Sequence, residues 1–70
     1  MKSIQIKFGK RIKDLRKTHD FTQDNLAAKA KISTKYLQNL ESKNPKKASI
    51  VTIESLAKAF DISISELMNF

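Results

Sequence analysis

Residues 31–41, KISTKYLQNLE, combine apolar side chains with a row of hydrogen-bonding groups. At helical spacing, Tyr36, Leu37 and Leu40 can fill one face of a helix. The other face offers a hydroxyl, an amine and two carboxamides, from Thr34, Lys35, Gln38 and Asn39. In a DNA major groove, asparagine and glutamine can pair with adenine, lysine can donate to guanine, and threonine presents a methyl group to thymine. These four side chains are therefore candidates for base contacts, and the alternative is a helix face that is polar only because it is solvated.

The charge of the chain is distributed unevenly. Residues 1–47 carry thirteen basic and four acidic side chains, a formal charge of +9, whereas residues 48–70 carry one basic and three acidic side chains, a charge of −2. A small domain with one strongly basic part favours a polyanionic partner, with nucleic acid ahead of a membrane surface. A lysine-rich surface that only maintains solubility would account for the same charge.

Length and composition exclude several classes of protein. Seventy residues are enough for one domain, which we expect to span residues 1–70. The absence of cysteine excludes disulfides and thiolate metal sites, and a single histidine is too few for a histidine metal cluster. No apolar run approaches the roughly 20 residues of a membrane span. We therefore expect a cytoplasmic protein with no membrane partner, no metal and no cofactor.

The acidic residues do not suggest a catalytic site. Catalysis would require a nucleophile, an acid–base pair or a metal in a pocket. Asp14, Asp20, Asp24 and Glu54 show no ligand spacing and no sign of a shared site. Gly9 stands alone inside the first predicted helix, so the chain has no phosphate-binding glycine loop. The sequence therefore predicts a protein that is not an enzyme.

Apolar residues recur at helical spacing along the whole chain, without the alternation that a strand would require. This pattern predicts an all-α domain with helices at residues 4–18, 23–30, 34–42, 50–60 and 64–69. The segment 42–48, SKNPKKA, is predicted to be a loop because a residue that precedes proline, here Asn44, avoids helical backbone angles.

Hydroxyl side chains stand at four of the predicted helix starts, where they can accept hydrogen bonds from free backbone amides. These predicted caps are Thr22, Ser33, Ser49 and Ser63. Ser63 and Glu66 also have the spacing of a capping box.

Only residues 31–33 separate the second and third predicted helices. A turn of this length sets two helices at a steep angle, as in a helix-turn-helix, which we expect at about residues 22–42. The helix at residues 34–42 would then be held out from the body of the domain, where it can enter a major groove.

Residues 21–41, FTQDNLAAKAKISTKYLQNLE, resemble the phage repressor and Cro type of helix-turn-helix, often called the Xre family. The family's Leu-Thr-Gln-x-x-Leu-Ala segment corresponds to FTQDNLA, its Gly-Val-Ser turn to KIS, and its Tyr-Ile-x-x-Ile-Glu segment to YLQNLE. The resemblance extends over residues 8–67. It implies a compact, five-helix, lambda-repressor-like domain and a sequence-specific transcriptional regulator that binds double-stranded DNA. Small members of the family include phage regulators, restriction–modification controllers and antitoxins.

The resemblance also implies roles for individual residues. Positions that usually face base edges are occupied by Thr34, Lys35 and Asn39, with Gln38 as a further candidate. Positions that usually contact DNA phosphates are occupied by Gln23, Ser42, Lys46 and Lys47. Arg16 and Glu41 match a buried ion pair that ties the first helix to the end of the third, the alternative being an exposed pair. Tyr36 is expected either in the core or against DNA.

The chain departs from the family at several turn positions. Glycine is frequent in the family where the backbone takes left-handed angles, and this chain has Asp20, Lys31, Lys43 and Asp61 there. Aspartate tolerates such angles better than lysine does. The loop after the third helix is one residue longer than in many members, and Ala48 replaces a common proline. The path of residues 42–48 is therefore the part of the fold that the resemblance describes least well.

A single recognition helix reads only a few base pairs, so we expect a homodimer on an inverted-repeat operator. Two copies related by a twofold axis would read half-sites about 34 Å apart. The expected dimer interface is formed by Ile64, Leu67, Met68 and Phe70 at the C-terminal end. The alternatives are that Met68 and Phe70 fold back onto the first helix, and that the main partner is a protein, as for an antitoxin.

Overall fold

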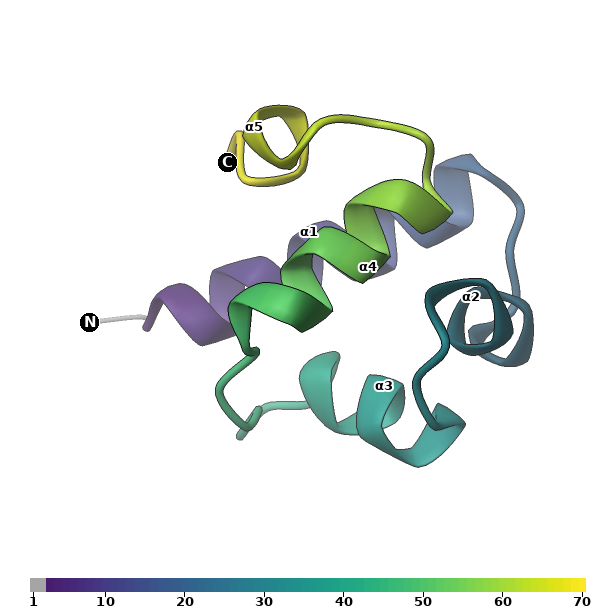
Figure 1. Ribbon diagram of the computed structural model, residues 1–70. Coiled ribbons are helices and arrows are strands. Elements are labelled where there is room, and N and C mark those ends of the chain that lie inside the picture. Colours follow the sequence, from purple (N-terminus) through teal and green to yellow (C-terminus); the bar gives the residue numbers. More distant parts are fainter. Residues whose placement is uncertain (1–2) are drawn as a thin grey trace.

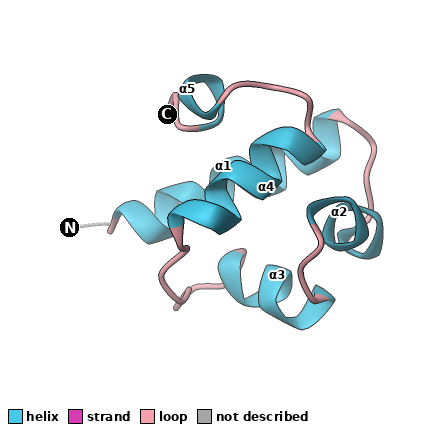
Figure 2. Ribbon diagram, in the orientation of Figure 1, coloured by secondary structure: helices cyan, strands magenta, loops and turns pink. Residues whose placement is uncertain are grey.

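The computed structural model describes residues 3–70 and shows five helices (Figure 1). They are α1 (Ile4–Thr18), α2 (Gln23–Ala30), α3 (Thr34–Leu40), α4 (Ile50–Ala59) and α5 (Ile64–Leu67). Residues 3–70 contain no strand (Figure 2), which confirms the predicted all-α, five-helix fold. No helix in this range combines the length and the apolar character needed to cross a membrane.

Side-chain oxygens cap the N-termini of all five helices. Ser3, Thr22, Ser33, Ser49 and Ser63 each accept a hydrogen bond from the backbone amide three residues further on. The last four of these caps confirm the sequence prediction, and the cap at Ser3 was not predicted. Because each cap satisfies a free amide of the first turn, these hydroxyls explain where the helices begin.

The reciprocal capping box lies at a different helix from the one predicted. The Thr22 hydroxyl accepts from the Asn25 amide, and the Asn25 side-chain oxygen accepts from the Thr22 amide at 3.3 Å. At α5, the Glu66 carboxylate lies 3.5 Å from the Ser63 hydroxyl and does not close the bond to the Ser63 backbone amide. The prediction of a capping box at Ser63 is therefore wrong. The Glu66 carboxylate lies beside the Ser63 hydroxyl instead of accepting from the Ser63 backbone amide.

The helices α3, α4 and α5 end one or two residues before their predicted boundaries. At the end of α3, the Ser42 amide donates to the Asn39 carbonyl at 3.0 Å, and the Ser42 hydroxyl donates to the same oxygen at 2.6 Å. At the end of α4, the Asp61 amide donates to the Lys58 carbonyl at 3.0 Å. These backbone hydrogen bonds join residues three apart instead of four. They satisfy the last carbonyls and end the regular helix.

Left-handed backbone angles occur at three of the four positions where they were expected. The φ angles are 59° at Asp20 and 57° at both Lys31 and Asp61. Lys43 does not have a positive φ, so that expectation is wrong. The two bonds from Ser42 already satisfy the end of α3, and the longer loop reverses the chain without a left-handed residue.

The core is shared by all five helices, with α1 and α4 between α3 at one edge and α5 at the opposite edge (Figure 1). Each helix contributes at least one of the largest fully buried side chains, which are Ile12, Leu26, Leu37, Leu40, Leu56 and Leu67. Burial of each such side chain contributes about 1.5–3 kcal/mol. This shared core fixes the position of α3 relative to the other helices.

Gly9 allows the closest approach of α1 to the end of α3. It is buried, and a Cβ atom built at this position would overlap the backbone carbonyl oxygen of Leu40. A backbone oxygen cannot rotate away as a flexible side chain could. The sequence placed Gly9 inside a helix but contained no sign that this glycine was required by packing.

Candidate nucleic-acid interface

The turn between α2 and α3 holds α3 at the edge of the molecule (Figure 1). Lys31 takes left-handed angles, its amide bonds to the last turn of α2, and Ser33 then caps α3. The buried Leu37 and Leu40 attach α3 to the core. This arrangement is the helix-turn-helix expected from the sequence, and it leaves the polar face of α3 directed away from the core.

Arg16 and Glu41 form a bidentate ion pair between α1 and the residue after α3. The Arg16 Nε lies 3.0 Å from Glu41 Oε2, and Nη2 lies 3.1 Å from Oε1. The side chains are only 14% and 4% exposed, respectively. A third nitrogen, Nη1, donates to the Phe21 carbonyl at 3.1 Å. The pair therefore has the enclosed geometry expected from the sequence and joins α1, the start of the α2 segment and the end of α3.

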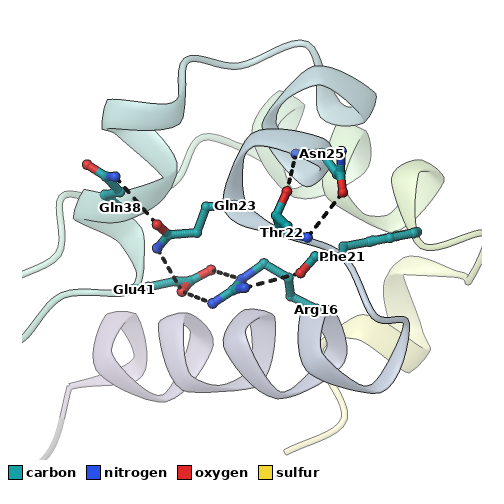
Figure 3. A network of polar contacts seen from close by, with 7 residues as sticks. All are labelled: Arg16, Phe21, Thr22, Gln23, Asn25, Gln38 and Glu41. Atoms are coloured by element: carbon teal, nitrogen blue, oxygen red, sulfur yellow. Dashed lines mark hydrogen bonds and ion pairs between the residues drawn. The ribbon is translucent and has the colours of Figure 1, made fainter.

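A chain of hydrogen bonds runs from this ion pair to the surface of α3 (Figure 3). The Gln23 side-chain nitrogen donates to Glu41 Oε1 at 3.3 Å. The Gln23 side-chain oxygen accepts from the Gln38 nitrogen at a longer 3.4 Å. Gln23, the first residue of α2, is thus held between a buried carboxylate and an exposed residue of α3, a bracing role that the family resemblance also implies.

The predicted base-contacting residues differ in how free they are. The Thr34 hydroxyl donates to the Asp24 carboxylate at 2.8 Å, which leaves its methyl group and an acceptor lone pair for other contacts. Lys35 and Gln38 are exposed on α3. Asn39 is half-buried, and its side-chain oxygen accepts from the Lys46 backbone amide at 2.7 Å. Lys35 is therefore the side chain of the four with the most freedom to reach a ligand.

The loop that follows α3 carries three of the predicted phosphate-contacting residues, Ser42, Lys46 and Lys47. All three are exposed, although the Ser42 hydroxyl is occupied by the bond that ends α3. Tyr36 is half-buried against the core, which agrees with the core alternative, and its hydroxyl lies 3.5 Å from the Lys47 carbonyl. Lys46 borders the same hollow as Lys35 and Asn39, so this loop lysine lies beside the polar face of α3.

The residues expected at a dimer interface do not all reach the surface. Ile64 and Phe70 are 42% and 49% exposed, and Met68 packs partly against the core. Leu67 is completely buried within its own domain, so its expected place in the interface is corrected to a core position. A leucine at this point of α5 closes the core, and only its neighbours remain available to another molecule.

Two further features of the surface were missed by sequence reasoning. Arg11 donates to the backbone carbonyls of Glu66 and Leu67 at 2.8 and 3.3 Å, which binds the end of α5 to α1. Ile50 and Val51 are exposed in the first turn of α4. Residue type gave no sign of this exposure, because consecutive apolar residues are buried together elsewhere in the core, as at Leu26 and Ala27.

The sequence matches the family described as helix-turn-helix domain over residues 9–69. The control protein C.MunI from a Mycoplasma species is 31% identical over 70 residues, which cover 99% of this chain and 93% of that protein. Both matches include α2, the turn and α3.

Solved structures show the same fold. The restriction–modification controller protein C.AhdI from Aeromonas hydrophila superposes with a TM-score of 0.84 at 33% identity, covering 90% of this chain and 94% of that one. SinR, a master regulator for biofilm formation whose structure was solved in complex with DNA, superposes with a TM-score of 0.80 at 31% identity. That match covers 89% of this chain and 98% of the SinR chain in that structure.

Proposed function

Because this chain belongs to the helix-turn-helix domain family and is a DNA-binding transcriptional regulator, we propose that α3 enters the major groove of a specific double-stranded sequence. The observation that carries this proposal is the polar outer face of α3. The buried inner face of α3 packs on the core and holds the helix at the edge of the molecule. A major groove about 12 Å wide admits one α-helix. The structure is a binding scaffold, and the proposal assigns it no catalytic step.

Base contacts and backbone contacts are assigned to different parts of this surface. Lys35 is proposed to donate to a guanine edge, with Thr34 and Gln38 at neighbouring bases. Gln23 at the start of α2 and the lysines at 46 and 47 are proposed to contact phosphates on either side of the groove. The charge of +9 over residues 1–47 supports this backbone attraction.

The regulator is proposed to bind as a homodimer on an inverted repeat. One α3 of seven residues offers few side chains for base reading, whereas two copies would double the recognised sequence. Ile64, Met68 and Phe70 at the C-terminal end provide the apolar surface for a twofold contact. This surface lies at the edge opposite α3 in Figure 1, so pairing through it would leave both recognition helices uncovered.

The regulated system is proposed from the relatives. C.AhdI is a restriction–modification controller, and C.MunI is a control protein that matches almost the full chain. These similarities favour control of a restriction–modification operon over other regulons, although SinR shows that a related fold also serves biofilm formation. Since both controllers come from bacteria, whose DNA lies in the cytoplasm, the protein is proposed to act there.

An unbiased selection of DNA sequences bound at physiological salt tests the proposed function. We expect enrichment of an inverted repeat with half-sites about one helical turn apart. The Lys35→Ala variant should alter the enriched sequence, whereas Lys58→Ala, which removes an exposed lysine of α4, should leave it unchanged. Recovery of random sequences by the folded wild-type protein would contradict sequence-specific binding.

A further inference from the structure

The loop after α3 is tied to α3 by side chains of α3 itself. Asn39 accepts a 2.7 Å hydrogen bond from the Lys46 backbone amide, across seven residues of sequence. The Tyr36 hydroxyl approaches the Lys47 carbonyl at 3.5 Å. The Asn39 bond is much the shorter of the two, so it is the principal link between α3 and the second half of the loop.

The orientation of the Asn39 carboxamide follows from this bond. A backbone amide can only donate, so the atom that faces Lys46 must be the Asn39 oxygen and cannot be its nitrogen. The nitrogen is left to donate elsewhere. If the Asn39 side chain turned toward a base edge, its hydrogen bond to the loop would break. Asn39 therefore cannot hold the loop and contact a base through the same oxygen.

The loop contact places charged groups around one hollow. Ser33, Lys35, Tyr36, Asn39 and Lys46 line an open hollow of about 360 Å³ beside α3. Lys35 comes from α3 and Lys46 from the loop, yet both border the same space. No acidic residue lines this hollow, so its two lysines suit an anionic ligand such as the DNA backbone.

We propose that Asn39 is a positioning residue for DNA phosphate binding, which it promotes by holding the Lys46 segment against α3. This inference rests on the proposed DNA-binding function and changes the role expected for Asn39 from the sequence, which was base contact. The phosphate contact is made by Lys46. Asn39 acts through that lysine, because without the 2.7 Å bond the backbone that carries the Lys46 side chain would no longer be fixed to α3.

The salt dependence of DNA affinity distinguishes positioning from base contact. Asn39→Ala removes no charge, so loss of a base contact leaves the slope of log affinity against log salt unchanged. Loss of a lysine–phosphate contact reduces that slope by about 0.9. We expect Asn39→Ala to reduce the slope by about one unit and to weaken binding to selected and random duplexes alike.

Two further variants make this measurement specific. In the Lys46→Ala background, Asn39→Ala should have little additional effect, because the charge that it positions is already absent. Gln38→Ala is the matched control, since it removes a neighbouring neutral carboxamide of α3 whose hydrogen bond goes to Gln23 of α2 instead of to the loop. Its salt slope should equal that of the wild type. Additive losses in the double variant, or losses confined to the selected sequence, would overturn the proposal.

Hydrogen exchange of the Lys46 amide tests the loop contact without DNA. We expect this amide to be protected in the wild-type protein and in Gln38→Ala, and to exchange at the rate of an open loop in Asn39→Ala. An unprotected wild-type amide would overturn the positioning role even for a protein that binds DNA specifically. Conversely, protection together with a failure to select any DNA sequence would count against the proposed function while leaving the loop contact intact.

Discussion

The Glu41 carboxylate accepts two hydrogen bonds from the Arg16 guanidinium and is almost completely buried where α1 meets the end of α3. The same carboxylate also accepts from Gln23, the first residue of α2. One acidic side chain therefore connects α1 and the start of α2 to the end of α3, the proposed recognition helix. Because its charge is compensated almost entirely by Arg16, the pair is expected to behave very differently from an exposed one.

Removal of one partner of this pair should strongly destabilise the fold. Arg16→Ala leaves the buried Glu41 charge without its partner and should lower the free energy of unfolding by about 3–5 kcal/mol. The exposed pair of Lys58 and Glu54, with atoms 3.9 Å apart, is the control. Glu54→Ala should change stability by less than about 1 kcal/mol. Equal effects in urea unfolding would show that the pair at Arg16 is solvated in solution.

A methyl group at Gly9 should also destabilise the protein. At an exposed helix position, alanine is more favourable than glycine by about 1 kcal/mol. At position 9, however, the alanine Cβ would meet the backbone oxygen of Leu40. The strain should outweigh this gain, and Gly9→Ala is expected to lower stability by about 1–3 kcal/mol. Thermal unfolding measures the change, with Lys10→Ala at the exposed next position as control. A higher unfolding midpoint for Gly9→Ala would contradict the close approach of α1 and α3.

Substitution of Lys31 by glycine is expected to stabilise the protein. Its φ of 57° is unfavourable for a residue with a Cβ, so Lys31→Gly should stabilise the fold by up to about 1 kcal/mol. Ala28→Gly is the comparison, since a glycine inside α2 should lower the stability of the fold by about 1 kcal/mol. If Lys31→Gly lowers the unfolding midpoint, the greater entropy of glycine in the unfolded chain outweighs the relief of strain.

Base reading should depend on Lys35. Lys35→Ala is expected to weaken binding to the selected sequence by about 1–3 kcal/mol and to relax preference at one or two base positions. Lys58→Ala removes the same charge from α4 and should preserve sequence preference. Competition binding against duplexes with single substitutions measures both effects. A uniform loss on selected and random DNA would reassign Lys35 to the phosphate backbone.

Pairing of two copies should depend on the exposed apolar residues of the C-terminal end. Ile64→Asp combined with Phe70→Asp places charges on this surface without altering the buried Leu67. Sedimentation on an inverted-repeat duplex should show two wild-type copies and only weak, single occupancy by the variant. Ala28→Asp, on an exposed position of α2, controls for added charge. A variant that pairs as the wild type does would place the interface elsewhere, with Ile50 and Val51 as the next surface to alter.

Local features of the sequence determined the helices and their starting points. The hydroxyls of Thr22, Ser33, Ser49 and Ser63 cap their helices as predicted, because a cap depends only on neighbours within one turn. The short turn at Lys31 and the apolar spacing around it likewise predicted a protruding α3. These relations involve residues close in sequence, so no knowledge of the tertiary structure was needed.

Tertiary structure decided which of the polar residues are free to bind and which are occupied. Asn39 belongs to a predicted recognition face, but its oxygen is used by the Lys46 amide. Leu67 belongs to an apolar chain end, but packing from the other helices buries it completely. Gly9 has the sequence context of an ordinary helical residue, but the Leu40 carbonyl lies against it. Each of these contacts joins groups that are far apart in the sequence and meet only when the helices pack. Residue type and spacing along the chain do not specify which groups will meet.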